Sequence, residues 1–205
     1  ERGRIVLFSA PCGFGKSVVS HALLRDCRVR ELSADGAGFA LPEDDGTWDV
    51  LLLDQMQNLP EEEQDGLCQL LRTAVGRRFV LLSRGALPGW LTPFQFSGLL
   101  QVFTADDLAL HREGTAELLA RYGVTLPDTE LNAVVRDGCG HPLALDMLGR
   151  CMAARREGYT PAVEQTVRRQ MMTYFEDAVY RRFDLSLRRF LLELSPFEPF
   201  DLELA

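Results

Sequence analysis

The sequence predicts an α/β chain in which a parallel sheet forms in the first half and helices follow in the second. Three observations support this fold class. A short apolar run at 4–9 is followed by a glycine-rich loop and then by a helical pattern. A continuous apolar run at 48–54 ends in an acid, which is typical of a parallel strand buried on both faces. From 104 onward the apolar residues follow a helical period.

The segment APCGFGKS at 10–17 predicts a phosphate-binding loop, or P-loop, between the first strand and a helix at 16–25. Gly13 and Gly15 would let backbone N–H groups point at phosphate oxygens, and the helix N-terminus favours negative charge. Lys16, the only lysine among 22 basic residues, would contact the β- and γ-phosphates, and the Ser17 hydroxyl would bind Mg²⁺. We therefore expect ATP or ADP with Mg²⁺ as ligands.

The P-loop prediction departs from the usual G-x-x-x-x-G-K-[ST] pattern at one place, because Ala10 stands at the first glycine position. Alanine is tolerated there if the backbone does not need a positive φ. A glycine-rich turn without a ligand is the alternative interpretation. The predicted nucleotide-binding residues are Pro11, Cys12, Gly13, Phe14, Gly15, Lys16, Ser17 and Val18.

The remaining elements of the first half follow from local patterns. Residues 34–46 carry turn residues with no clear period and predict a loop. Pro60 and the acids after it predict the first turn of a helix that continues to about 75. Further strands are predicted at 27–32, 48–54, 79–84 and 99–103.

The second half is predicted to be all-α. Thr104 and the acids that follow it resemble a capping box, from which one helix is expected to continue to Tyr122. Further helices are expected at about 128–138, 141–156, 161–180 and 185–194. These patterns predict a nucleotide-binding domain at 1–103, a helical lid at 104–157 and the start of a further module at 158–205.

Two residues that follow the apolar run at 48–53 are expected to decide the chemistry. Asp54 is placed to hold Mg²⁺, although a solvated strand-end carboxylate is the alternative interpretation. Gln55 stands where many NTPases of this architecture have a second acid that polarises the attacking water. An amide can orient water but cannot take its proton, so hydrolysis is expected to be slow or absent.

One further residue and one short segment are candidate nucleotide contacts. Arg84 ends the strand at 79–84 and would read the γ-phosphate, although a strand-end arginine can equally be a surface charge. Gly140, His141 and Pro142 would seat the nucleotide base or only begin a helix, since proline is favoured in a first turn.

Composition excludes several functions. A net charge of −8 would repel a polyanion, so we expect no direct DNA binding by this part of the protein. The apolar runs are far shorter than the roughly 18 residues of a membrane span. The 5 cysteines form no C-x-x-C pair, which disfavours zinc and disulfides and favours the cytoplasm. The first residue, Glu1, indicates a piece of a longer chain.

Four segments in a fixed order resemble the STAND class of signal-transducing P-loop ATPases, and within it the large ATP-binding LuxR-type (MalT-like) transcriptional regulators. They are APCGFGKS at 10–17, WDVLLLDQ at 48–55, FVLLSR at 79–84 and CGHPLALDML at 139–148. Such proteins typically show an APAGFGKT-like loop, a strand ending in paired acids, an SR strand and a GxP helix start. The region from Tyr174 resembles the start of their winged-helix region.

The resemblance implies a P-loop NTPase core of AAA+/STAND type, a helical lid and a winged-helix start. It implies that Lys16 and Ser17 bind phosphates and Mg²⁺, that Asp54 binds the metal, that Arg84 contacts the γ-phosphate and that Pro142 lies near the adenine. The implied function is an ATP/ADP-operated switch that self-associates on ATP binding, with sensor and helix-turn-helix domains elsewhere in the chain. The alternatives are an active P-loop ATPase or kinase-type enzyme and a scaffold with a vestigial site.

Overall fold

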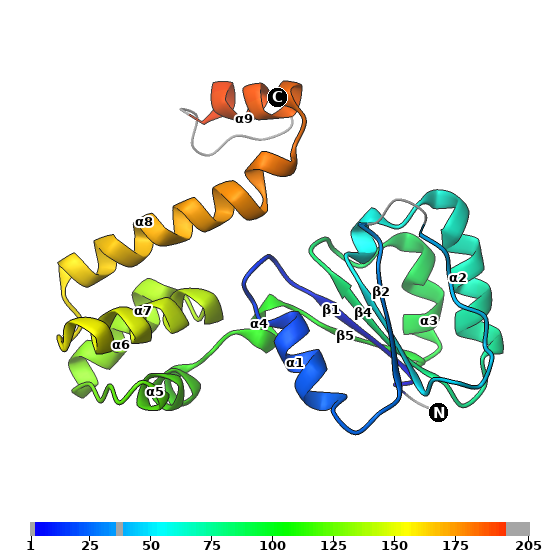
Figure 1. Ribbon diagram of the computed structural model, residues 1–205, viewed down its shortest axis with the longest axis horizontal. Coiled ribbons are helices and arrows are strands. Elements are labelled where there is room, and N and C mark those ends of the chain that lie inside the picture. Colours follow the sequence, from blue (N-terminus) through cyan, green and yellow to red (C-terminus); the bar gives the residue numbers. More distant parts are fainter. Residues whose placement is uncertain (1–2, 36–38, 196–205) are drawn as a thin grey trace. The chain divides into compact units, whose positions relative to one another are not determined.

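The computed structural model describes residues 3–35 and 39–195. The chain forms two compact units (Figure 1). The first contains the residues up to Thr115 together with Val135–Leu143, and the second contains Ala116–Val134 together with the residues from Ala144 onward. The predicted loop residues 36–38 and the end of the predicted winged-helix start, 196–205, lie outside the described residues.

The first unit is built on a five-stranded parallel sheet with the strand order β2-β3-β4-β1-β5. Its strands are β1 (Ile5–Ser9), β2 (Val29–Ser33), β3 (Val50–Asp54), β4 (Arg78–Ser83) and β5 (Leu100–Phe103). All five predicted strands are confirmed, and the parallel arrangement is confirmed with them. The order places β4 between β3 and β1, so the strand with the predicted metal ligand does not pair with the strand that precedes the loop.

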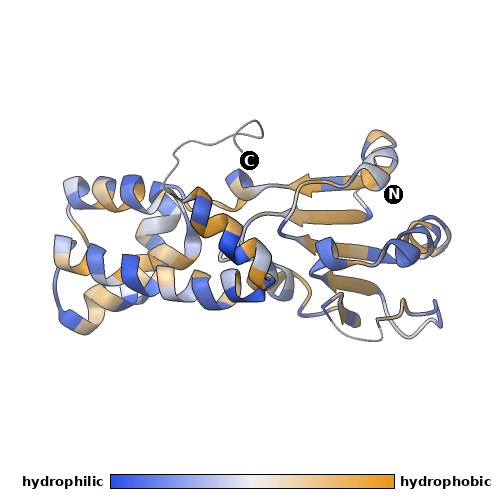
Figure 2. Ribbon diagram, turned by 90° about the horizontal axis from the view of Figure 1, so that it is seen from above, coloured by the Kyte–Doolittle hydropathy of each residue, from blue (hydrophilic) through white to orange (hydrophobic). Residues whose placement is uncertain are grey.

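The strands form because their apolar runs are covered on both faces. Leu7, Leu81 and Leu53 are aligned across three neighbouring strands and have no exposed surface. Alternate residues of the same strands, including Leu52 and Leu82, form a separate cluster on the opposite face. Figure 2 shows the strands as apolar and the outer surfaces of the helices as largely hydrophilic. This pattern is typical of a parallel sheet between helical layers.

Helices cover the two faces of the sheet (Figure 1). α1 (Lys16–Leu23) lies on one face with α4 (Ala105–Leu108). The other face is covered by α2 (Glu61–Thr73), the 3₁₀ helix η2 (Gly89–Leu91) and α3 (Thr92–Phe96). A further 3₁₀ turn, η1 (Met56–Asn58), follows β3 directly.

The single helix predicted from Thr104 to Tyr122 is wrong, because the structure contains two helices there. The capping box at Thr104 is present, and it starts α4. That helix ends where Ala109 becomes extended, with φ −64° and ψ 137°. The next N–H, of Leu110, donates to the Gly140 carbonyl at 2.9 Å, and α5 (Arg112–Arg121) then begins. A distant hydrogen bond therefore overrides the helical pattern.

The second half is helical, as predicted. Its other elements are α6 (Asp128–Gly138), α7 (Pro142–Arg155), α8 (Pro161–Ala178), the 3₁₀ turn η3 (Tyr180–Arg182) and α9 (Leu185–Leu194). α8 and α9 begin at side-chain caps, since Thr160 accepts from the Val163 N–H at 3.3 Å and Asp184 accepts from the Leu187 N–H at 2.8 Å. Across the described ranges, no helix has the length and apolar content needed to cross a bilayer.

We predict that Leu81→Ala lowers the free energy of unfolding by about 2–5 kcal/mol, because a fully buried leucine in the central strand leaves a cavity when truncated. Urea titration followed by circular dichroism measures this loss. Val75→Ala is the control, because Val75 is 74% exposed and its truncation should cost less than about 0.5 kcal/mol. Equal losses for the two variants would contradict the prediction.

Candidate functional site

The strand order brings three predicted site residues to one edge of the sheet. β1 and β4 are in register to their ends, where Ser9 pairs with Ser83, and Arg84 follows directly. Asp54 is the last residue of β3, on the other side of β4. Lys16 begins α1 after the loop that leaves β1. The carboxyl end of β4 therefore separates the predicted metal ligand from the predicted phosphate loop.

The charges at both strand ends affect the pKa of Lys16. Burial is the largest effect, and it lowers the pKa of the ammonium. The Cys12 thiol raises this pKa, the positive charge of Arg84 lowers it and the negative charge of Asp54 raises it. Arg84 and Asp54 therefore act on the ammonium from the neighbouring strand ends. An anion at this place would meet two cations and one carboxylate.

The loop between β1 and α1 has the backbone shape that a phosphate cradle needs. Gly13 and Gly15 have φ of +87° and +76°, values that other residues rarely adopt. The Ala10 N–H donates to the Ser83 carbonyl at 3.1 Å, which fixes the start of the loop against β4. Lys16 Nζ donates to the Ala10 and Pro11 carbonyls, at 2.6 and 3.0 Å, and so lies within the curve of the loop.

The start of α7 packs against this loop within the first unit, although more than a hundred residues separate the two in sequence. His141 Nε2 lies 3.1 Å from the Cys12 carbonyl oxygen. The His141 ring packs edge-on against the Phe14 ring, with 4.7 Å between the ring centroids. The Leu143 N–H donates to the Gly13 carbonyl at 3.1 Å. His141 was named in the sequence with Gly140 and Pro142 as a possible seat for the nucleotide base, whereas Leu143 was not predicted. Leu143 binds the loop through its backbone N–H, which no side-chain pattern in the sequence signals.

This contact explains the glycine at position 13, and a second close approach, to the end of α4, explains the one at position 140. A Cβ on Gly13 would lie 2.5 Å from Cε1 of His141, which real Cβ atoms do not reach. Gly140 has φ +68°, and a Cβ there would lie 3.0 Å from Cβ of Ala109. The His141 ring therefore packs against Gly13, and the segment before α7 packs against Ala109, at places where a larger residue would not fit without a shift.

The protonation of His141 follows from its partner. A carbonyl oxygen only accepts hydrogen bonds, so the contact with Cys12 places a hydrogen on Nε2. Burial lowers the pKa of His141, and the hydrogen bonds to the Cys12 and His141 backbone oppose this effect only in part. The ring therefore favours its neutral form.

The other predicted residues lie where their sequence positions imply. Gln55 adopts the left-handed conformation with φ 56°, and its N–H donates to Asp54 Oδ1 at 2.7 Å. Ser17 follows Lys16 in the first turn of α1, and the Val18 side chain is 74% exposed. Pro142 is the first residue of α7.

No group of three or more His, Cys, Asp or Glu side chains within residues 3–35 and 39–195 is arranged to hold a metal ion. Magnesium in nucleotide sites takes much of its coordination from phosphates and water. The hydroxyl of Ser17 and the carboxylate of Asp54 are the donor types that such a site uses. They fit Mg²⁺ that arrives with a nucleotide better than an ion held by protein alone.

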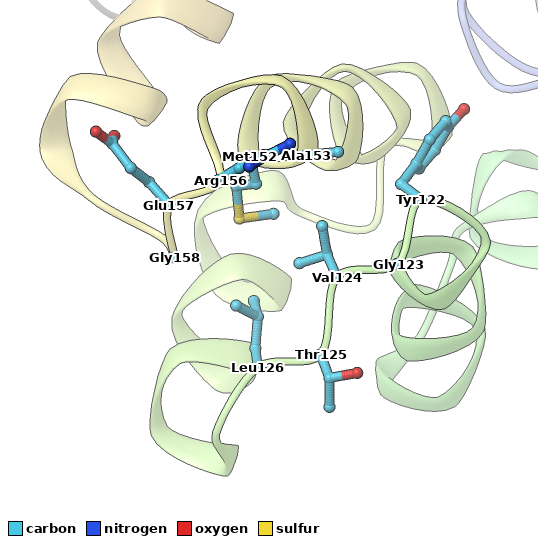
Figure 3. A pocket seen from close by; sticks show the side chains of 10 residues that line it. All are labelled: Tyr122, Gly123, Val124, Thr125, Leu126, Met152, Ala153, Arg156, Glu157 and Gly158. Carbon is cyan, nitrogen blue, oxygen red and sulfur yellow. The ribbon is translucent and has the colours of Figure 1, made fainter.

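A separate pocket of about 350 Å³ lies in the second unit (Figure 3). It is lined by residues 122–126, 152–153 and 156–158. Arg156 and Glu157 bring charge to it, and buried Met152 brings an apolar surface. None of the predicted site residues lines this pocket.

Comparison with solved structures identifies the fold. The chain is similar to the Thermotoga maritima RuvB Holliday junction branch migration motor, with a TM-score of 0.54 and 14% identity over 97% of this chain and 71% of that one. It is also similar to the Walker-type ATPase PabY2304 of Pyrococcus abyssi, with a TM-score of 0.57 and 12% identity over 98% of this chain and 81% of that one. No family model and no curated protein matches the sequence. The predicted fold class is confirmed, since the chain has a P-loop NTPase fold.

We predict that Gly13→Ala and His141→Ala are energetically coupled. Gly13→Ala introduces backbone strain, a clash with the His141 ring and a tight contact of 3.1 Å with Leu143 Cβ, and His141→Ala removes only the clash with the ring. The double variant should therefore be more stable than the sum of the single effects implies, by about 0.5–3 kcal/mol. Urea unfolding of the four proteins of the cycle measures the coupling.

Gly15 supplies the matched control. Its φ is +76°, but a Cβ there would meet no atom within 4 Å. Gly15→Ala should therefore be destabilising without any rescue by His141→Ala. Additive effects in the Gly13 cycle, or equal rescue in both cycles, would contradict the contact.

We also predict that two histidines change stability with opposite pH dependence. Because burial lowers the pKa of His141, the folded state loses stability as pH falls through the unfolded value of about 6.5. The hydrogen bond with Glu31 raises the pKa of His21, so that histidine contributes stability that is present below about pH 6.5 and lost as pH rises through its folded pKa.

Urea unfolding between pH 5.5 and 8 tests the signs. The free energy of unfolding of wild type should exceed that of His141→Gln by less at pH 5.5 than at pH 8, because glutamine keeps an N–H donor for Cys12 and does not titrate. The excess of wild type over His21→Gln should instead be larger at pH 5.5 than at pH 8. If both excesses changed in the same direction with pH, the assignment would be wrong.

Proposed function

We propose that this chain is an ATP/ADP-binding regulatory switch module of a STAND-class, MalT-like transcriptional regulator of the LuxR family, with slow or absent ATP hydrolysis. The observation that carries the proposal is the order β3-β4-β1, which gathers Asp54, Arg84 and Lys16 at one sheet edge. The loop with positive φ at Gly13 and Gly15 lies at the same edge.

In this proposal each residue has one task. The backbone N–H groups from Cys12 to Val18, in the loop that follows Pro11, and the ammonium of Lys16 bind the phosphates. Ser17 and Asp54 hold Mg²⁺, which neutralises phosphate charge when it is bound. Arg84 lies between the loop and Asp54 in the strand order, so it is the cation best placed for a γ-phosphate.

The slow hydrolysis in the proposal rests on Gln55. This residue follows Asp54 in the left-handed conformation, and its N–H is engaged by the Asp54 carboxylate at 2.7 Å. Its amide side chain has no basic group with which to take a proton from water. A bound triphosphate would therefore persist long enough to act as a signal.

The conformational part of the proposal uses the contact between the loop and α7. The Leu143 N–H and the His141 ring bind the carbonyls of Gly13 and Cys12, so a ligand that reshapes the loop also acts on the first turn of α7. A ligand shifts such an equilibrium only through different affinities for the two states. The γ-phosphate is the group by which ATP and ADP differ.

The family part of the proposal rests on the ordered motifs at 10–17, 48–55, 79–84 and 139–148. It includes a nucleotide-binding domain at 1–103, a helical lid at 104–157 with Pro142 near the adenine, and a winged-helix start at 158–205. The proposed partners are nucleotide, the sensor and helix-turn-helix domains of the same chain, and further copies on ATP binding. We propose a cytoplasmic location and no direct DNA contact by this part of the chain, whose charge is −8.

We predict that Lys16→Ala weakens binding of Mg-ATP and Mg-ADP by about 10- to 150-fold, the loss expected for a hydrogen bond to a charged group. Calorimetric titration measures both affinities. Arg25→Ala is the control, because it removes an exposed positive charge close to the end of α1 and should leave both affinities within about twofold. We also expect nucleotide to be released when the purified wild-type protein is denatured.

Two results would overturn the proposal. Wild type that binds neither nucleotide, or that binds as weakly as Lys16→Ala, would exclude a nucleotide switch and favour a vestigial site. ATP turnover by wild type at about 1 s⁻¹ or faster, the low end of ordinary enzyme rates, would favour the active enzyme instead.

A further inference from the structure

One amide side chain joins the ends of β3 and β4. Gln57 lies in η1, the turn that follows β3. Its Nε2 donates to Gln55 Oε1 at 2.7 Å, and its Oε1 accepts from the Arg84 N–H at 3.0 Å. Both ends of the amide are therefore used, one toward each strand end.

The hydrogen bonds continue to the predicted metal ligand. Gln55 donates its N–H to Asp54 Oδ1 at 2.7 Å, and its carbonyl accepts from the Asn58 N–H at 2.8 Å. Gln55 has φ 56° and ψ 35°. Residues other than glycine keep this left-handed conformation only when their surroundings hold them there. The bonds from Gln57 and Asn58 supply that restraint.

η1 is also attached on the side of β2. The Asn58 side-chain amide donates to the Asp35 carboxylate, and the Ala34 N–H donates to the Asp54 carbonyl at 3.0 Å. Because the turn is held from the β2 side, a displacement of the Arg84 backbone is not absorbed by free movement of η1. It is passed to Gln55 and Asp54.

We propose that Gln57 is a positioning residue that couples Arg84 to Asp54 and thereby sets the preference of the site for a nucleoside triphosphate over a diphosphate. The inference rests on the proposed function. Gln57 would act on the γ-phosphate through Arg84, because it holds the backbone N–H of that residue. Directional hydrogen bonds in series polarise one another, so the state of one end affects the other.

Gln57→Met tests the coupling, because methionine fills a similar volume and makes neither hydrogen bond. The probes are the magnesium complexes of ADP and of a non-hydrolysable ATP analogue, titrated by calorimetry. We expect the ratio of the two affinities to fall about tenfold, within the usual range of coupling between sites, while ADP affinity stays within about twofold. Gln69→Met is the matched control, since Gln69 is an exposed glutamine on α2.

Gln57→His provides a rescue that a purely structural role would not show. A neutral imidazole has one N–H donor and one acceptor, which is enough for the two hydrogen bonds that the Gln57 amide makes, so the triphosphate preference should be kept at pH 8. The protonated ring has two donors and no acceptor for the Arg84 N–H. The preference should therefore be lost in this variant at pH 5.5, below the ordinary histidine pKa of about 6.5, and kept in wild type at the same pH.

A measurement without nucleotide checks the hydrogen bonds themselves. Amide exchange by NMR should be faster at the Arg84 N–H in Gln57→Met than in wild type or Gln69→Met. Unchanged exchange at Arg84 would overturn the inference, as would an unchanged affinity ratio in Gln57→Met or an equal fall in Gln69→Met. Wild type that binds no nucleotide would overturn the proposed function as well, whereas normal binding with an unchanged ratio overturns the inference alone.

Discussion

The rest of the site depends on the pairing of β4 with β1 on one side and β3 on the other. This arrangement is stabilised by leucines without exposed surface, and the register sets Ser83 beside Ser9 at the end of the strands. Hydrogen bonding along parallel strands leaves their carboxyl ends at a common edge. Once β4 is central, Arg84 must emerge between the loop and Asp54, and no side-chain interaction is needed to bring it there.

The loop is supported from two directions, and the two supports differ in kind. On the sheet side, the bond from the Ala10 N–H to the Ser83 carbonyl belongs to the same framework as the strands. On the helical side, the support comes from His141 and Leu143, which the chain supplies only after α6. A loop held in its binding shape before ligand arrives loses less entropy on binding. The helical half of the sequence therefore contributes to a site whose motif lies entirely in the first 18 residues.

What could be predicted from the sequence was local. Buried parallel strands need continuous apolar runs, so the strands near 5–9 and 50–54 were evident. The capping box at Thr104 was evident because its threonine and acids lie within four residues of one another. The end of α4 was not, because a bond between Leu110 and Gly140 decides it. Gln57 gave no signal either, since an exposed amide in a turn resembles any polar loop residue until its partner on β4 is known.

α7 belongs to both compact units, because Pro142 and Leu143 lie in the first and the helix continues from Ala144 in the second. Its 14 residues make a rod of about 21 Å. The Leu143–Gly13 hydrogen bond therefore lies within the first turn of a single helix that begins in one unit and continues in the other. The boundary between the two units falls inside a helix, where the backbone hydrogen bonds are continuous, and not in a loop.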